Sequence, residues 1–265
     1  MKMVKKILLG LAATAAVLSM AGCKMTDDEE KAITGSGKTK SINKQNDTDD
    51  NYRAYISTDF KHAGALVKVT FEDPDEAGFS KMGVIFDLCE NKDKSKNFYI
   101  IGVAPSAYSN FYISKFENVT DLQADNFGTK LTSNPAKETE FIALNTGTSK
   151  NTEKDITLPA KAEDGSISLY IYFKAFEDGK YECAALNLTD EEVKQIKIDT
   201  FKLADLNSSK ILKSYNITDG FEPVTAANKV PQNKIAVYAN VLKHTTLNGK
   251  WNFTSTYLEA EEIEE

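Results

Sequence analysis

The sequence has few of the side chains that enzymes most often use for catalysis. It holds two histidines, three cysteines and a single arginine, Arg53. Three cysteines are too few for the disulfide scaffold of a small secreted domain. A basic balance is also missing: the formal net charge is -7, which argues against nucleic acid as a partner, because such binding needs a basic footprint. What remains, 41% hydrophobic and 27% charged residues, is typical of a globular protein and excludes a collagen-like repeat or a coiled coil.

The N-terminus has the order of an export signal. Three lysines within residues 1–6 precede an uncharged, mostly apolar run at 7–20, and the small residues Ala21 and Gly22 come directly before Cys23. This charged, apolar, small-residue order is that of a secretory leader. The apolar run is shorter than the ~20 residues that a membrane-spanning helix needs. We therefore expect a signal peptide over residues 1–22 and no permanent transmembrane anchor.

The run Met20-Ala21-Gly22-Cys23 resembles the lipobox of bacterial lipoproteins. The resemblance implies that the leader is removed and that Cys23 becomes the first residue, with its thiol carrying fatty acyl chains such as palmitate. Methionine replaces the usual aliphatic residue at position 20 but is apolar and of similar volume. Each buried acyl CH₂ contributes ~0.8 kcal/mol, so two or three chains would hold the protein on a membrane. The expected location is the bacterial cell envelope, at the outer membrane or the cell surface.

Residues 23–51 are expected to form a disordered tether behind the lipidated cysteine. Two acidic runs, Asp27–Glu30 and Asp47–Asp50, flank a Gly-Ser-Gly at 35–37, and large apolar residues are almost absent. Such a segment buries too little apolar surface to offset the entropy of ordering it. A flexible coil of about 28 residues reaches roughly 30 Å.

Residues 52–265 are predicted to form one antiparallel β-sandwich domain of the jelly-roll type. The clearest sign is the stretch 166–173, where Ile167, Leu169, Ile171 and Phe173 alternate with serines and tyrosines. A period of two places these four apolar side chains on one face of a sheet. Further strands are expected at 65–71, 82–88, 97–103, 110–119, 140–144, 180–188, 197–203 and 234–241. Many short strands without interleaved helices indicate a sandwich or barrel.

Turn and cap signals complete the predicted fold. Asn248-Gly249 is a strong hairpin signal, because a type I′ turn needs positive φ at both central positions. The stretch 177–180 predicts a second turn between the strands around it. Thr189 and Glu192 form a capping box, which predicts a short helix near 189–196.

Several strand sequences resemble the concanavalin/laminin-G class of jelly rolls. They are MGVIF at 82–86, NFYIIGV at 97–103, FYISKFENV at 111–119, KIAVYANVLKH at 234–244 and NGKWNFTSTYLEAE at 248–261. In that class a glycine-apolar-phenylalanine strand lies beside a glycine-apolar-tyrosine strand. The resemblance implies that 82–86 neighbours 235–239, with Ala236 where the class often has glycine. It implies a fold and no activity.

Catalytic signatures are weak, and no catalytic residue is predicted. His62 and His244 are far apart and have no serine or cysteine signature near them, so both are expected at the surface. Polysaccharide hydrolases of the concanavalin class carry Glu-x-Asp-x-(x)-Glu on one strand. The nearest stretch, Glu72-Asp73-Pro74-Asp75-Glu76, contains a proline and predicts a turn.

A weak calcium site is considered at Asp87, Glu90, Asn91 and Asp93, since oxygen ligands suit a hard cation. The spacing lacks the glycine and the final glutamate of an EF-hand loop. Three lysines, at positions 92, 94 and 96, would repel a divalent ion. A solvated hairpin loop is therefore the favoured interpretation, and no cofactor is expected.

The remaining candidate is an aromatic binding face made of Tyr170, Tyr172, Tyr238, Asn240 and Trp251. Exposed aromatic rings stack on sugar rings, while amides take the hydroxyls. The alternative is that these aromatic residues simply pack, since aromatic residues favour strands in any case.

Two cysteines remain after lipidation, Cys89 and Cys183. In an exported protein they either form a disulfide or serve as small apolar residues.

The sequence therefore predicts a non-catalytic binding or adhesion module on the cell envelope, for a glycan or a protein. The alternatives are a carbohydrate-active hydrolase of the same fold and a structural lipoprotein with no small ligand.

Overall fold

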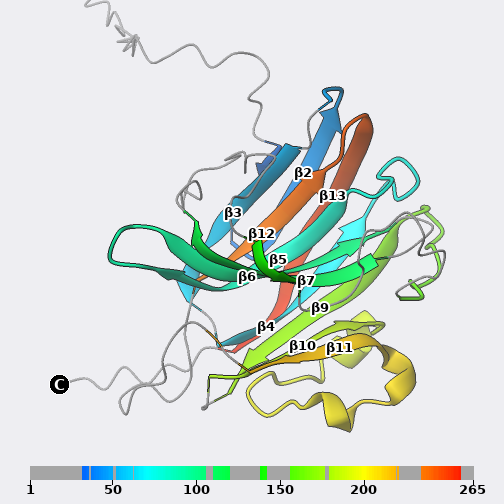
Figure 1. Cartoon of the computed structure of the whole chain (residues 1–265). Helices are drawn as coiled ribbons and strands as arrows, with labels where there is room; N and C mark the ends of the chain where they lie inside the picture. The colour runs from blue at the N-terminus through cyan, green and yellow to red at the C-terminus, as the bar shows by residue number, and fades with distance from the viewer. Residues whose placement is uncertain are drawn as a thin grey trace, which may run out of the picture.

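Two antiparallel sheets form the protein in the computed structural model (Figure 1). The structure describes residues 32–35, 37–49, 52–61, 63–105, 110–119, 138–141, 156–176, 179–218, 220 and 234–257. The seven-stranded sheet has the order β1 (Ile33–Thr34), β2 (Thr39–Asn46), β13 (Thr245–Tyr257), β4 (Gly64–Phe71), β9 (Ile167–Ala175), β10 (Tyr181–Leu186) and β11 (Ile211–Ile217). The six-stranded sheet has the order β3 (Tyr52–Lys61), β12 (Lys234–Val241), β5 (Lys81–Glu90), β6 (Lys96–Ala104), β7 (Asn110–Val119) and β8 (Glu138–Phe141).

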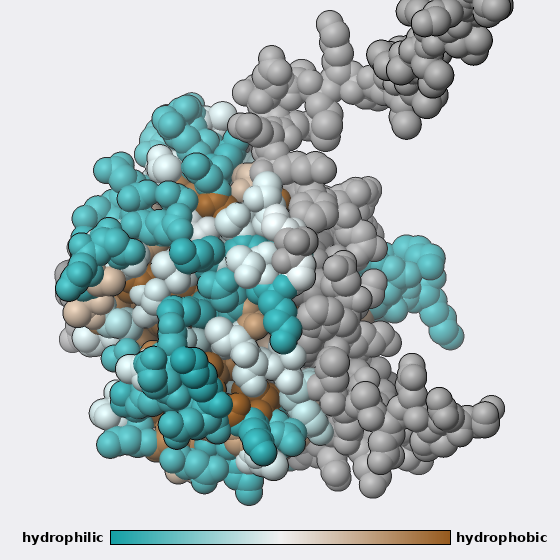
Figure 2. All heavy atoms as spheres, turned by 180° about the vertical axis from the view of Figure 1, so that it is seen from behind, coloured by the Kyte–Doolittle hydropathy of each residue, from teal (hydrophilic) through white to brown (hydrophobic). Residues whose placement is uncertain are grey.

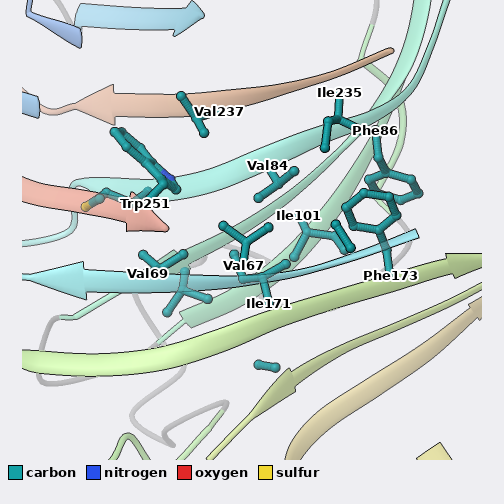
Figure 3. Packing of buried hydrophobic residues seen from close by; sticks show 14 of the residues in the cluster. Val67, Val69, Val84, Phe86, Ile101, Ile171, Phe173, Ile235, Val237 and Trp251 are labelled. Atoms are coloured by element: carbon teal, nitrogen blue, oxygen red, sulfur yellow. The ribbon is translucent and has the colours of Figure 1, made fainter. Parts of the chain in front are cut away.

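The core lies between the two sheets and explains why these segments are strands. Alternate residues of each strand point into it, as with Ile171 and Phe173 on β9 and Val84 and Phe86 on β5 (Figure 3). The rings of Phe86 and Phe173 stack across the sheets with centroids 5.0 Å apart. Both residues are buried, and burial of an aromatic side chain contributes about 2 kcal/mol or more. The expected antiparallel β-sandwich is therefore confirmed.

The connections are those of a jelly roll, because the chain repeatedly crosses from one sheet to the other. It crosses between β2 and β3, β3 and β4, β4 and β5, β8 and β9, β11 and β12, and β12 and β13. The expected neighbours, 82–86 and 235–239, are also found side by side. Strand β12 pairs with β5, with Val237 opposite Val84 and Tyr238 opposite Gly83.

The expected tether is wrong for the part that the structure describes. Strand β2 takes up eight of its residues and pairs with β13 along its whole length. Composition hid this strand because its inward positions include Lys40 and Asn46 as well as the apolar Ile42. Both polar side chains are hydrogen-bonded: Lys40 Nζ donates to the Gly35 carbonyl at 3.3 Å, and Asn46 Nδ2 to the Val241 carbonyl at 3.1 Å. The folded part therefore begins by residue 32.

The predicted hairpin at Asn248-Gly249 is also wrong, since β13 runs straight through both residues. The inward alternation of Leu247, Gly249, Trp251 and Phe253 is unbroken along this strand. A Cβ on Gly249 would lie 2.4 Å from the Thr70 carbonyl oxygen and 2.6 Å from Met82 Sδ. The glycine thus serves close packing inside the sandwich. The chain turns earlier, around His244, which has a φ of 55°.

A long excursion between β10 and β11 carries the only α-helix of the described residues, α1 (Asp190–Val193). Its capping box is confirmed: Thr189 Oγ1 accepts from the Glu192 amide, and the Glu192 carboxylate accepts from the Thr189 amide. The predicted strand at 197–203 is wrong. Turns and two 3₁₀ helices, η2 (Leu203–Asp205) and η3 (Ser208–Lys210), follow α1 instead.

The predicted leader and the lipobox cysteine, Cys23, lie outside the described residues. No helix in the described ranges is long and apolar enough to cross a membrane. The two remaining cysteines lie on different sheets, Cys89 on β5 and Cys183 on β10, and they are not joined to each other.

Candidate functional site

The five residues predicted to form one aromatic face lie on three different levels of the sandwich. Tyr170 and Tyr172 are on the outer face of the seven-stranded sheet, and Trp251 is in the core between the sheets. Tyr238 and Asn240 alternate with core residues of β12, which places them on the outer face of the six-stranded sheet. The structure therefore does not bring the five residues together.

The outer face around Tyr170 and Tyr172 is covered by the protein itself. We call the covering segment, residues 188–206, the cap; its buried apolar residues are Leu188, Val193, Ile198, Phe201 and Leu203. The ring of Phe201 meets the ring of Tyr172 edge-on, with centroids 5.2 Å apart. On the side opposite to that of Figure 1, hydrophilic atoms dominate the described surface and apolar atoms show only in small patches (Figure 2).

Under the cap, both tyrosine hydroxyls are satisfied. Tyr170 donates to Asp190, and Lys68 Nζ reaches the same carboxylate at 2.7 Å. Tyr172 donates to Glu182 at 3.1 Å. Burial, and then the adjacent carboxylate, raises the pKa of each tyrosine.

The cap is also held through its backbone. The ammonium of the buried Lys174 donates to the carbonyl oxygens of Asp199 and Phe201, at 2.8 and 3.0 Å. The amide of Leu203 donates to Glu182 at 3.3 Å. Sequence alternation correctly placed the tyrosines away from the core, but here the packing alternative holds.

The outer face of the six-stranded sheet is built differently. Seven buried apolar side chains form a separate cluster there, and we call it the apolar band. Its members are Ile85, Leu88, Phe98, Ile100, Phe116, Ala236 and Tyr238. They belong to β5, β6, β7 and β12, and no other described segment contributes to the cluster.

A row without side chains adjoins Tyr238 at one end of this band. Tyr238 is paired in register with Gly83, and Gly83 with Gly102 on β6. A Cβ on Gly83 would lie 2.0 Å from the Ile101 carbonyl oxygen, so only glycine fits there. The two adjacent glycines, both buried, place backbone without side chains beside Tyr238. Glycine inside a strand marks a place where a ligand or another part of the chain can approach closely.

Asn240 lies one step farther along the same face of β12 and holds an unpaired polar atom. Its side chain is 7% exposed, and its buried Oδ1 has no hydrogen-bond partner. An unsatisfied buried oxygen costs about 1–3 kcal/mol. The structure thus retains an unfavourable acceptor between a tyrosine ring and the end of the sheet. We take the row of Asn240, Tyr238, Gly83 and Gly102 as the candidate site.

The residues considered for calcium binding form hydrogen bonds or ion pairs with other side chains of the protein. Asp87 sits at a bulge in β5 with a φ of 51°, is buried, and accepts from the Tyr181 hydroxyl at 3.1 Å. Glu90 is paired with Lys94 at 2.9 Å and with Lys96. These hydrogen bonds, that of Lys96 first, lower the pKa of Glu90 to about 2.

The rest of that loop is bonded within itself. Asp93 accepts from the amide and hydroxyl of Ser95, and Asn91 Nδ2 donates to Ser95 and Asn97. The loop joins the paired strands β5 and β6, as the favoured hairpin interpretation predicted. Among the described residues, no three histidine, cysteine or acidic side chains are placed to hold a metal ion.

Several of the described titratable groups have pKa values shifted by hydrogen bonds or by burial. Hydrogen bonds hold the pKa of Asp164 and Glu192 below their ordinary values, through Ser166 and the Thr189 amide respectively. Burial raises the pKa of the Cys183 thiol and so keeps it protonated. His244, which is exposed, lies 3.2 Å from the exposed Asp49.

Among the solved structures that are similar to this chain, two carbohydrate-binding modules are distant in sequence. No family model matches the sequence, and no curated protein does. The carbohydrate-binding module CBM66 from Bacillus subtilis is similar with a TM-score of 0.39 and 9% identity, over 85% of this chain and 91% of that chain. The CBM2 module of the evolved Dit of Lactobacillus casei BL23 phage J-1 has a TM-score of 0.29 and 8% identity, over 86% and 77%. Both TM-scores are below 0.5.

Proposed function

We propose that the protein is a non-catalytic binding module for a saccharide, anchored to the bacterial cell envelope by a lipid on Cys23. The observation that carries the binding function is the buried, unpartnered Oδ1 of Asn240 beside Tyr238 and two adjacent glycines. A sugar hydroxyl would donate to this oxygen, and the apolar face of the ring would lie against the tyrosine and the backbone of the two glycines.

The non-catalytic part of the proposal is supported by the carboxylates. A glycosidase needs a carboxylic acid whose pKa is raised, so that it holds a proton near neutral pH. Glu90, Asp164, Asp190 and Glu192 have pKa values shifted the opposite way.

The anchor is supported by the leader and lipobox pattern of residues 1–23. Because the folded part begins by residue 32, at most residues 24–31 separate Cys23 from the sandwich. A coil of about eight residues spans only about 16 Å. The binding module would therefore sit close to the membrane, nearer than a tether ending at residue 51 allows.

A glycan array with the processed protein tests the binding function, with the Asn240→Leu variant beside it. Leucine keeps the volume and removes the acceptor, so binding should fall about 5- to 150-fold, because a hydrogen bond to a buried group contributes about 1–3 kcal/mol. The matched control is Tyr172→Phe, which alters a tyrosine under the cap and should leave binding unchanged. Absence of binding to every glycan, or equal binding by Asn240→Leu, would refute the assignment.

Mass spectrometry of the processed protein tests the anchor. Diacylglyceryl and acyl mass on an N-terminal Cys23 is expected. A retained leader, or an unmodified cysteine, contradicts it.

A further inference from the structure

One outer surface of the sandwich is polar but almost free of charge. It is formed by the outward positions of β2 and β13, which lie side by side in the seven-stranded sheet (Figure 1). We call it the polar face. All but one of its side chains are hydroxyls or amides: Thr39, Ser41, Asn43, Gln45, Thr246, Asn248, Asn252 and Thr254. The exception is Lys250, whose ammonium is paired with Glu72 at 3.1 Å.

The polar face is open to solvent. Its four residues on β2 are exposed, and those on β13 are exposed or half-buried. The cap stands at its border, because Lys68, in register with Asn252, reaches Asp190 of α1 at 2.7 Å. Along β2 the face extends from Thr39 to Gln45, which is roughly 20 Å at about 3.4 Å per residue.

The asparagines of this face are not explained by the fold. Asparagine is disfavoured in strands, where threonine, valine and isoleucine fit better. Asn43 and Asn248 nevertheless lie opposite each other in the middle of their strands, and Asn252 follows on the same face. Within the described ranges, the side chains of Asn43 and Asn252 make no hydrogen bond. A departure from local preference that brings no structural gain is expected at a functional surface.

The chemistry of the polar face narrows the class of ligand. Nucleic acids and anionic membranes need a basic surface, whereas Lys250 and the bordering Lys68 are each paired with a carboxylate. Protein partners bind mainly through aromatic residues and arginine at the centre of an interface, and the polar face holds neither. Amides and hydroxyls both donate and accept hydrogen bonds, as sugar hydroxyls do.

We propose that the polar face is a further saccharide-binding surface and that it takes an uncharged polysaccharide chain. It lies on the opposite sheet from Asn240, so this inference does not depend on the site proposed there. A saccharide chain laid along β2 and β13 would meet unpaired amides at Asn43 and Asn252, with the cap beside it.

Affinity electrophoresis of the processed protein tests this proposal, in native gels that contain dextran, mannan, soluble starch, β-glucan or the anionic polygalacturonate. At least one of the four neutral polysaccharides should slow the protein, and polygalacturonate should not. Retardation should be equal at low and high salt, since no net charge takes part. Asn43→Ala should weaken binding about 2- to 13-fold, and Asn43→Ala/Asn252→Ala about 5- to 150-fold. The matched control is Asn216→Ala, an exposed amide at the far edge of the same sheet, which should bind as the unaltered protein does.

Three results would overturn the proposal. They are no retardation by any of the four neutral polysaccharides, retardation that high salt abolishes, and retardation that Asn43→Ala/Asn252→Ala leaves unchanged. In the last case, loss of retardation in Asn240→Leu would assign binding to the Asn240 site alone. Retardation that persists in Asn240→Leu but is lost in the double variant would support the polar face, and would count against the Asn240 site for the same polysaccharide.

Discussion

The outer faces of the two sheets both carry tyrosines, but the surroundings of these tyrosines differ between the two faces. On the seven-stranded sheet the cap covers Tyr170 and Tyr172, and each hydroxyl has a carboxylate partner. On the six-stranded sheet the buried cluster around Tyr238 consists of strand residues alone, and the neighbouring Asn240 has an unpaired oxygen. A face whose polar groups are all satisfied within the chain is structural. A buried acceptor without a partner is a cost that ligand binding would remove.

The largest expected effect on stability comes from disrupting the contact between the cap and the outer face of the seven-stranded sheet. Phe201→Ala removes the ring that packs against Tyr172 and should lower the free energy of unfolding by about 3 kcal/mol. Phe79→Ala is the matched control, because Phe79 is 42% exposed and should change stability by less than about 0.5 kcal/mol. Urea unfolding measures both. Equal small losses would show that the cap is not part of the folded unit.

A pair of asparagine variants sharpens the comparison. Asn46→Leu removes the hydrogen bond to the Val241 carbonyl and should cost about 2 kcal/mol. Asn240→Leu removes an unpaired oxygen and should raise stability by about 1 kcal/mol while lowering ligand affinity. Thermal or urea unfolding without ligand measures whether each variant is more or less stable than the unaltered protein. A loss of stability in Asn240→Leu would show that Asn240 has a structural role.

Tyr172→Phe should have a smaller effect. It removes the hydroxyl that donates to Glu182, while Glu182 keeps the Leu203 amide. The expected loss is about 1 kcal/mol, seen as a lower urea midpoint with an unchanged slope. A neutral result would mean that ring packing alone holds this part of the cap.

The smallest expected effect is a loss of stability of the cap at acidic pH. Lys68 first, and then Tyr170, lowers the pKa of Asp190 below its ordinary 3.8. A lowered carboxyl pKa gives stability that is present above the ordinary value and lost as the pH falls through the folded value. Because Asp190 is largely exposed, the contribution should stay below about 1 kcal/mol. Hydrogen exchange should show the cap loosening below about pH 4, before β5 and β12. In Asp190→Asn this pH dependence should disappear from the cap.

Sequence reasoning predicted the regular strands well and the exceptions poorly. The bounds of β7 and β12 match the predicted 110–119 and 234–241, because both are buried, β-rich segments. Strand β2 was missed because a strand inside a sheet can point lysine and asparagine inward when the backbone nearby accepts their hydrogen bonds. The hairpin prediction at Asn248-Gly249 was wrong because this dipeptide forms a turn only where both residues can adopt a positive φ. Strand β13 is paired on both sides, and this pairing keeps the two residues extended.

The candidate site shows the same division. Alternation along β12 put Tyr238 and Asn240 on one face, which is a property of any extended chain. That Gly83 and Gly102 lie beside Tyr238 depends on the pairing of β12 with β5, which is distant from it in sequence, and on the pairing of β5 with β6, which follows it in the chain. Tyr170, Tyr172 and Trp251 were grouped with them only because they are aromatic.

By itself, the sequence determined the local features: the leader pattern, the capping box at Thr189, and the strands with their inward sides. These depend on neighbouring residues, whose spacing sets backbone preference and side-chain direction. Tertiary structure alone decided that the cap covers Tyr170 and Tyr172 and that the buried Asn240 Oδ1 and Trp251 Nε1 have no hydrogen-bond partner. Both depend on contacts between residues far apart along the chain, and satisfaction of a hydrogen bond is a property of the pair and not of either residue.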